Sequence, residues 1–119
     1  EALMVTTDAD GNQVFDFHDG AETTELYIAV EARGRGMDAQ TDTGYEDGDV
    51  IIAKNPSGGG FNLRVATGED IVDGDDLLPQ ADTGLWVEES GEGWAVAHAD
   101  ETKDLSGLAD PELVATEVN

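Results

Sequence analysis

Apolar and polar residues alternate with a period of two along several short segments of the chain. The clearest segment spans positions 24–32, where every second residue is apolar: Leu26, Ile28, Val30 and Ala32. Phe61, Leu63 and Val65 repeat the pattern. Because successive side chains of a strand point to opposite faces, this period predicts strands with one buried face. Apolar and β-branched runs predict six further strands, at 4–6, 14–17, 50–53, 85–88, 93–99 and 113–118.

Turn-forming residues separate these strands at short spacing. Asp-Gly pairs occur at 10–11, 19–20 and 47–48, and Pro-Ser-Gly-Gly-Gly fills 56–60. Each is a place where a chain reverses at low cost. No segment has the period of a long helix, and only 100–105 is expected to form a single helical turn. The pattern therefore predicts an all-β fold, a small barrel or sandwich.

The length of 119 residues fits one domain with a modest core. The segment 37–45 is the longest polar stretch. We therefore expect residues 1–40 to form an N-terminal β-rich arm or elaboration on a barrel domain at 41–119, with one continuous domain as the alternative.

A tight β-corner is predicted between Gly68 and Leu78. Turns at Thr67-Gly68 and Asp73-Gly74 flank the short apolar pair Ile71-Val72. Gly68 and Gly74 supply the positive φ that such turns require, and aspartates such as Asp75 bond local backbone amides. Because the corner carries no nucleophile, base or ligand cluster, its role is interpreted as structural.

The charge of the chain is extreme, with five basic and 28 acidic residues and a formal net charge of −23. Disorder would require few core formers, yet patterned apolar runs recur. We therefore predict a folded, halophilic protein whose acidic surface needs molar salt, where the Debye length falls to about 3 Å. A mimic of nucleic acid or a partner for a basic protein is the competing interpretation, disfavoured because the acids are spread evenly.

Composition also disfavours several partners and compartments. Direct nucleic-acid binding is disfavoured because no basic patch exists to replace phosphate counterions. Zero cysteines exclude disulfides and thiolate metal sites. No apolar run approaches the ~20 residues that a membrane-spanning helix needs, and no signal peptide is recognisable. The expectation is a protein assembled in a cytoplasm, with no membrane or nucleic-acid partner.

Two motif matches are set aside on their surroundings. Residues 34–39 fit the G-x-G-x-x-A dinucleotide pattern, but turn chemistry follows where the pattern needs a helix. Residues 8–12 resemble the start of a calcium loop, but the glycine is at the fourth position and no closing glutamate follows. A hairpin turn is the favoured interpretation there.

No catalytic or cofactor chemistry is predicted. His18 and His98 are far apart, without a third histidine for a zinc-type site, and both are expected at surface or half-buried strand positions. No G-x-S-x-G elbow surrounds any serine. The chain is therefore expected to be no enzyme, with no cofactor and no tightly bound transition metal; loosely held cations among the carboxylates are compatible with this.

Contacts between subunits are the remaining candidate role for individual residues. Trp86 and Trp94 are interpreted as core or interface residues in preference to a sugar-stacking platform. The small side chains beside Trp94 favour close approach of another backbone or subunit. Arg33 and Arg35 would pair with a neighbouring subunit's carboxylates or, equally, form internal or surface ion pairs. The candidate contacts are thus Arg33, Arg35, Trp94, Ala95, Ala97 and Ala99.

From Tyr45 to Val118 the order of features resembles the small β-barrel head decoration proteins of tailed viruses, the lambda-type family. The similarity runs through the strand opening at 47–50, the corner at 66–77, the segments 84–87 and 93–101, and the closing strand at 114–118. The order of these pieces carries the resemblance, which covers roughly the final two-thirds of the chain. Residues 1–40 are not explained by it.

The resemblance implies a β-clip, β-tulip-like barrel without an active site. It implies homotrimers at three-fold and quasi-three-fold positions on the outer surface of a virion, bound to the major capsid protein through the chain ends or the corner. The corner also resembles that of lipoyl and biotinyl carriers, but the hairpin that follows it lacks their lysine. The alternative function is a carbohydrate- or ligand-binding β module on a halophilic cell or virion surface.

Overall fold

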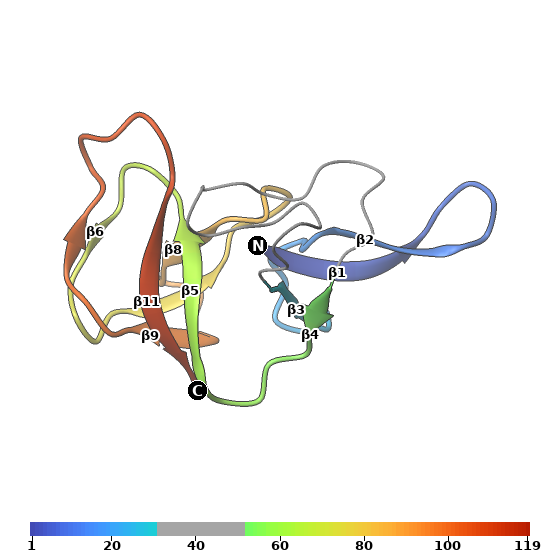
Figure 1. Cartoon of the computed structure of the whole chain (residues 1–119), viewed down its shortest axis with the longest axis horizontal. Coiled ribbons are helices and arrows are strands. Elements are labelled where there is room, and N and C mark those ends of the chain that lie inside the picture. The colour runs from blue at the N-terminus through green and yellow to red at the C-terminus, as the bar shows by residue number, and fades with distance from the viewer. Residues whose placement is uncertain (31–51) are drawn as a thin grey trace.

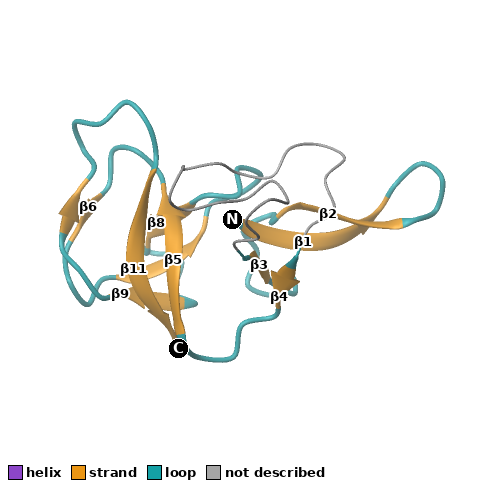
Figure 2. Cartoon of the chain, viewed as in Figure 1, coloured by secondary structure: helices purple, strands orange, loops and turns teal. Residues whose placement is uncertain are grey.

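The computed structural model describes residues 1–30 and 52–119, and the regular secondary structure of these residues is all β (Figures 1 and 2). This confirms the predicted all-β class. The described part contains these strands: β1 Ala2–Thr7, β2 Gln13–Phe17, β3 Tyr27–Ala29, β4 Ala53–Lys54, β5 Gly60–Val65, β6 Asp70–Ile71, β7 Asp76–Pro79, β8 Trp86–Glu88, β9 Ala97–Ala99, β10 Lys103–Asp104 and β11 Glu112–Val118.

Five strands close into a small barrel in the order β11-β5-β8-β7-β9. The long antiparallel pair β5–β11 runs from Val65 opposite Glu112 to Gly60 opposite Glu117. β9 closes the barrel by pairing with both β11 and β7, and a short parallel contact joins β5 to β8. Of the two predicted architectures, barrel or sandwich, the chain adopts the barrel.

The barrel interior is filled by the apolar residues that alternate along its strands. Trp86 is fully buried, as are Leu63, Val65 and Leu77. Phe61, the third member of the alternating set on β5, packs partly buried against this core. The predicted period of two on β5 is thus confirmed, and Trp86 serves as the core residue that a barrel of this size needs to fill its centre.

The N-terminal strands form a separate four-stranded sheet in the order β2-β1-β3-β4. β4 reaches Lys54, so this sheet extends beyond the expected boundary at position 40. Ala2 and Ile28 from the sheet nevertheless belong to the same buried apolar cluster as the barrel residues. The two parts therefore share one core, and the β1–β2 hairpin projects away from it (Figure 1).

The N-terminal sheet docks on the turn between β7 and β8. The Ala2 amide donates to the Gly84 carbonyl at 2.9 Å, and the Asp82 amide donates to the His18 carbonyl at 2.9 Å. Gly84 has a φ of 71°, and a Cβ on it would lie 2.7 Å from the Phe17 ring. Only glycine therefore allows this approach without strain.

His18 is 1% exposed, so its expected surface or half-buried position is wrong. Its Nδ1 accepts from the Gly20 amide at 2.9 Å, which leaves Nε2 as the donor to the Thr24 carbonyl at 3.0 Å. Asp19 lies 3.8 Å from the same Nδ1, but that nitrogen is already used as an acceptor. Neutral His18 thus holds the loop after β2 through one hydrogen bond at each ring nitrogen.

The predicted corner is present. Gly68 and Gly74 have φ values of 89° and 96°. The Asp75 carboxylate accepts from the Val72 amide at 2.8 Å, and the Gly74 amide donates to the Ala99 carbonyl at 2.8 Å. Local turn chemistry and a bond to the barrel together fix the reversal from β6 into β7.

The helical turn expected at 100–105 is wrong. Lys103 and Asp104 form β10, which pairs with β6 of the corner, and Leu105 is fully buried. The Leu105 amide donates to the Glu69 carbonyl, and the Leu105 carbonyl accepts from Gly68. Pairing with a strand distant in sequence satisfies the backbone here, so it overrides the weak local helix signal.

Two predicted strands are shorter than expected. Of 24–32, only Tyr27–Ala29 is strand within the described residues; of 93–99, only Ala97–Ala99 is. Gly91 and Gly93 have φ values of 119° and 82°, which keep the chain in a loop before β9.

Within the described residues no helix is long and apolar enough to cross a membrane.

Candidate functional site

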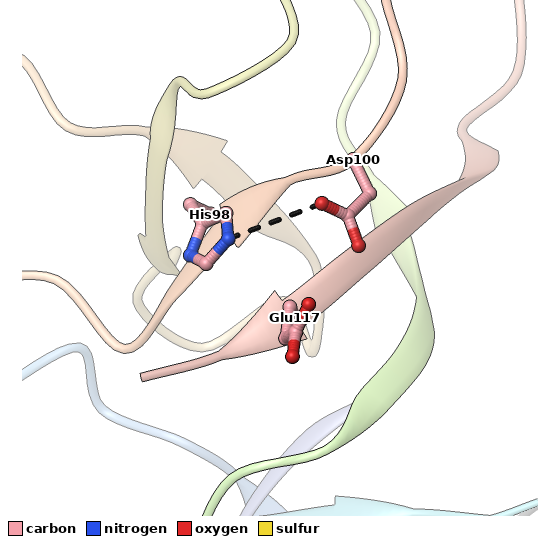
Figure 3. Close-up of side chains that lie close together, drawn as sticks. All are labelled: His98, Asp100 and Glu117. Carbon is pink, nitrogen blue, oxygen red and sulfur yellow. Dashed lines mark ion pairs between the residues drawn. The ribbon is translucent and has the colours of Figure 1, made fainter.

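The outward face of β9 carries the most chemically distinctive group of side chains. Ala97 and Ala99 point into the barrel, so His98 between them points outward. β9 lies between β7 and β11, which places Asp76 and Glu117 directly opposite His98 on its two sides. Asp100 follows two residues later. Figure 3 shows His98, Asp100 and Glu117 gathered on this face.

The backbone fixes this group from several sides. The Asp100 amide donates to the Ala115 carbonyl at 2.8 Å, and the Asn119 amide donates to the Val96 carbonyl at 2.9 Å. The His98 Nε2 lies 3.9 Å from Asp100 Oδ1. One ligand atom from each of His98, Asp100 and Glu117 lies within 4.8 Å of the others.

Asn119 orients the imidazole of His98. Its amide oxygen lies 3.0 Å from the His98 Nδ1, and because that oxygen only accepts, Nδ1 carries the proton. This hydrogen bond raises the pKa of His98 above the ordinary 6.5; nearby Asp100, Glu117 and Asp76 act in the same direction, while desolvation opposes them. Neutral His98 therefore presents the lone pair of Nε2 to the carboxylates.

The sequence alone does not bring these three side chains together. The spacing His98-Ala99-Asp100 places two of its members on one face of a strand, which was a usable signal. Glu117 could not be added, because the register between β9 and β11 is a tertiary fact. The group offers one nitrogen and two carboxylate oxygens, a set suited to a cation and, being exposed, unsuited to chemistry that must exclude water.

The fold leaves only some of the predicted subunit-contact residues accessible at the surface. Ala97 and Ala99 have no exposed surface, so their side chains contact their own core and are unavailable to another subunit. Ala95 and Trp94 are half-buried and keep some surface. Arg33 and Arg35 lie outside the described residues. The error at Ala97 and Ala99 arose because small side chains also suit the inside of a narrow barrel.

Trp94 lines an open hollow of about 340 Å³. Asp76, Glu89, Gly93 and Ala95 complete the lining. Trp86, the other candidate for an aromatic platform, is buried in the core. A two-tryptophan platform is thus excluded, and one half-buried aromatic ring among carboxylates remains.

The Glu89 carboxylate bonds two backbone amides of the loop before Trp94. Glu89 Oε1 accepts from the Gly91 amide at 2.8 Å and from the Gly93 amide at 3.0 Å. These two hydrogen bonds hold the pKa of Glu89 below its usual 4.5, and the bond from the Gly93 amide has the larger effect. The charged form of Glu89 therefore stabilises the loop that carries Trp94.

We expect this loop to loosen in acid. The folded-state pKa of Glu89 is depressed, so its contribution is present above pH 4.5 and is lost as pH falls through the lower folded value. The amide NMR shifts of Gly91 and Gly93 should titrate together with a midpoint below 4.5, and Glu89→Gln should abolish this titration. A midpoint at or above 4.5 would contradict the assignment.

Comparisons with protein families, curated proteins and solved structures find no match to this chain.

Proposed function

We propose that this protein is a structural decoration protein that binds as a homotrimer to the outer surface of a tailed-virus capsid, in a halophilic setting. The proposal is supported by the ordered features at 45–118 and by the small closed barrel that this segment contributes to, with its glycine corner. What the chain offers is a compact body with surfaces for contact.

The feature of the structure that supports the proposal most strongly is the projecting β1–β2 hairpin. Val5 and Phe17 are 43% and 40% exposed, and both lie on the face that also carries the Phe15–Tyr27 edge contact. A two-stranded hairpin is marginally stable alone in water. An arm of this kind, apolar on an otherwise highly acidic chain, is suited to lie against another protein surface.

Trimerisation would strengthen such a contact. Three copies of one weak contact, held by a closed three-fold assembly, bind a shell far more tightly than one copy does. Trp94 and Ala95 remain the described candidates for contacts between subunits, and Arg33 and Arg35 remain predictions.

We expect the protein to co-sediment with purified particles in molar salt and to be detected on them by mass spectrometry. Val5→Ser should weaken retention, because it removes apolar surface from the hairpin. Leu108→Ser is the matched control: Leu108 is 41% exposed in the loop between β10 and β11. Absence of the protein from particles would overturn the proposal, and weaker retention of Leu108→Ser alone would contradict the role given to the hairpin.

A carbohydrate- or ligand-binding module is the second candidate, favoured by the hollow beside Trp94. An aromatic ring beside carboxylates provides a stacking surface and hydrogen-bond acceptors for a sugar. Glycan-array binding in molar salt that is lost in Trp94→Ala would support this function. A particle-bound trimer without glycan binding would exclude it.

A further inference from the structure

The three potential ligands on the β9 face come from barrel positions that the backbone determines. His98 and Glu117 are direct cross-strand neighbours, and Asp100 follows His98 on the same face. Cβ atoms of such cross-strand pairs are about 4.5–5.5 Å apart. The three side chains therefore meet because of strand register, and backbone bonds on both sides of β9 hold that register.

The spacing of the ligand atoms suits one ion after small side-chain rotations. Zinc binds histidine nitrogen and carboxylate oxygen at about 2.0–2.2 Å, which puts two tetrahedral ligands roughly 3.3 Å apart. The Nε2–Oδ1 separation of His98 and Asp100 is 3.9 Å, and the whole set fits within 4.8 Å. Closing these gaps requires only rotation of exposed side chains.

The orientation of His98 matches what metal-binding histidines need. Metal-bound histidines almost always donate their other ring N–H to a carbonyl, carboxylate or water, which fixes the tautomer. His98 donates its Nδ1–H to the Asn119 side-chain oxygen at 3.0 Å. The Nε2 lone pair then faces two carboxylates, which is an arrangement that a cation between them stabilises.

We propose that His98, Asp100 and Glu117 form a binding site for one exchangeable divalent transition-metal ion of the Zn²⁺ type. Three protein ligands leave at least one coordination position open to solvent, so exchange is easy. Asp76, the other cross-strand neighbour of His98, adds negative charge beside the site. The site is independent of the decoration function proposed above.

The imidazole distinguishes this site from diffuse cation binding by an acidic surface. Mg²⁺ and Ca²⁺ prefer oxygen ligands, whereas imidazole nitrogen favours zinc and its neighbours in the transition series. Molar NaCl screens diffuse attraction strongly and a direct coordination bond much less. Selectivity for Zn²⁺ over Mg²⁺ in molar salt is therefore the expected signature.

The test is a Zn²⁺ titration of the full chain in molar NaCl, followed by ¹⁵N NMR of the imidazole rings. The Nε2 resonance of His98 should shift and saturate at one equivalent, and excess Mg²⁺ should not reverse the shift. The chain has two histidines, so His18, buried with both nitrogens bonded, is an internal reference that should not move.

Variants separate coordination from general charge. Asp100→Asn and Glu117→Gln should each weaken Zn²⁺ affinity, and Asn119→Ala should do so by about 10- to 100-fold through loss of orientation. In His98→Gln, Zn²⁺ binding is monitored through the amide shift of Glu117. This shift should no longer saturate at one equivalent of Zn²⁺. Asp110→Asn, which removes one exposed carboxylate from the β10–β11 loop, is the matched control and should bind as the parent does.

Three results would overturn the proposal. One is equal weakening by Asp110→Asn and Asp100→Asn, which would indicate diffuse binding. Another is full reversal of the His98 shift by Mg²⁺. The third is unchanged Zn²⁺ affinity in His98→Gln, judged on a variant whose amide spectrum shows an intact barrel.

Discussion

Withdrawal of salt should unfold this protein. A chain with a net charge of −23 on 119 residues stores strong self-repulsion in the compact state. At molar salt the Debye length is about 3 Å, and at 0.01 M it is about 30 Å, comparable to the size of a small domain. The melting temperature should therefore fall steeply between these limits.

The structure locates one source of this repulsion beside the barrel. The pKa of Glu88 on β8 is raised. Desolvation is the largest cause, followed by the negative charges of Asp75, Glu69, Asp70 and Glu89. A raised pKa means that the fold disfavours the ionised form of this carboxylate at neutral pH. Because this repulsion acts partly between exposed groups, salt relieves it.

Thermal unfolding followed by circular dichroism from molar to low-millimolar NaCl measures the effect. Glu88→Gln removes one charge from the crowded group and should lower the salt needed for folding. Asp110→Asn removes one charge from an exposed loop and should change it less. A melting temperature that is constant or rises as salt is withdrawn would contradict the halophilic interpretation.

Replacing Trp86 with alanine should cost about 3–5 kcal/mol of unfolding free energy. The Trp86 side chain lies in the core and has no solvent-exposed surface. In the sheet Trp86 pairs with Pro79 on β7 and with Val65 on β5. Small domains have total stabilities of only about 5–15 kcal/mol. The variant should thus be marginal even in molar salt.

Chemical unfolding in molar salt gives the measurement, and two further variants give the controls. Trp94→Ala removes the same side chain from a half-buried position and should cost much less. Trp86→Phe should cost an amount between these two, because part of the ring is retained and the Trp86 Nε1, which has no hydrogen-bond partner among the described residues, is removed. Equal costs for Trp86→Ala and Trp94→Ala would contradict the assigned core.

The sequence by itself determined the features that depend on neighbouring residues. Alternation predicted β5 and the all-β class, because side chains of a strand point alternately to its two faces. Gly68, Gly74 and Asp75 predicted the corner, because positive φ and local side-chain bonds are encoded within a few residues. The excess of acidic residues predicts a salt-dependent fold from charge alone, and this stays a prediction.

Tertiary structure alone decided what depends on pairing between distant segments. β10 formed where a helical turn was expected, because Lys103 and Asp104 found partners on β6. Ala97 and Ala99 face inward because β9 closes the barrel between β7 and β11. That same closure sets Glu117 opposite His98. Register between strands far apart in sequence has no local signal, so the candidate cation site was visible only in the folded chain.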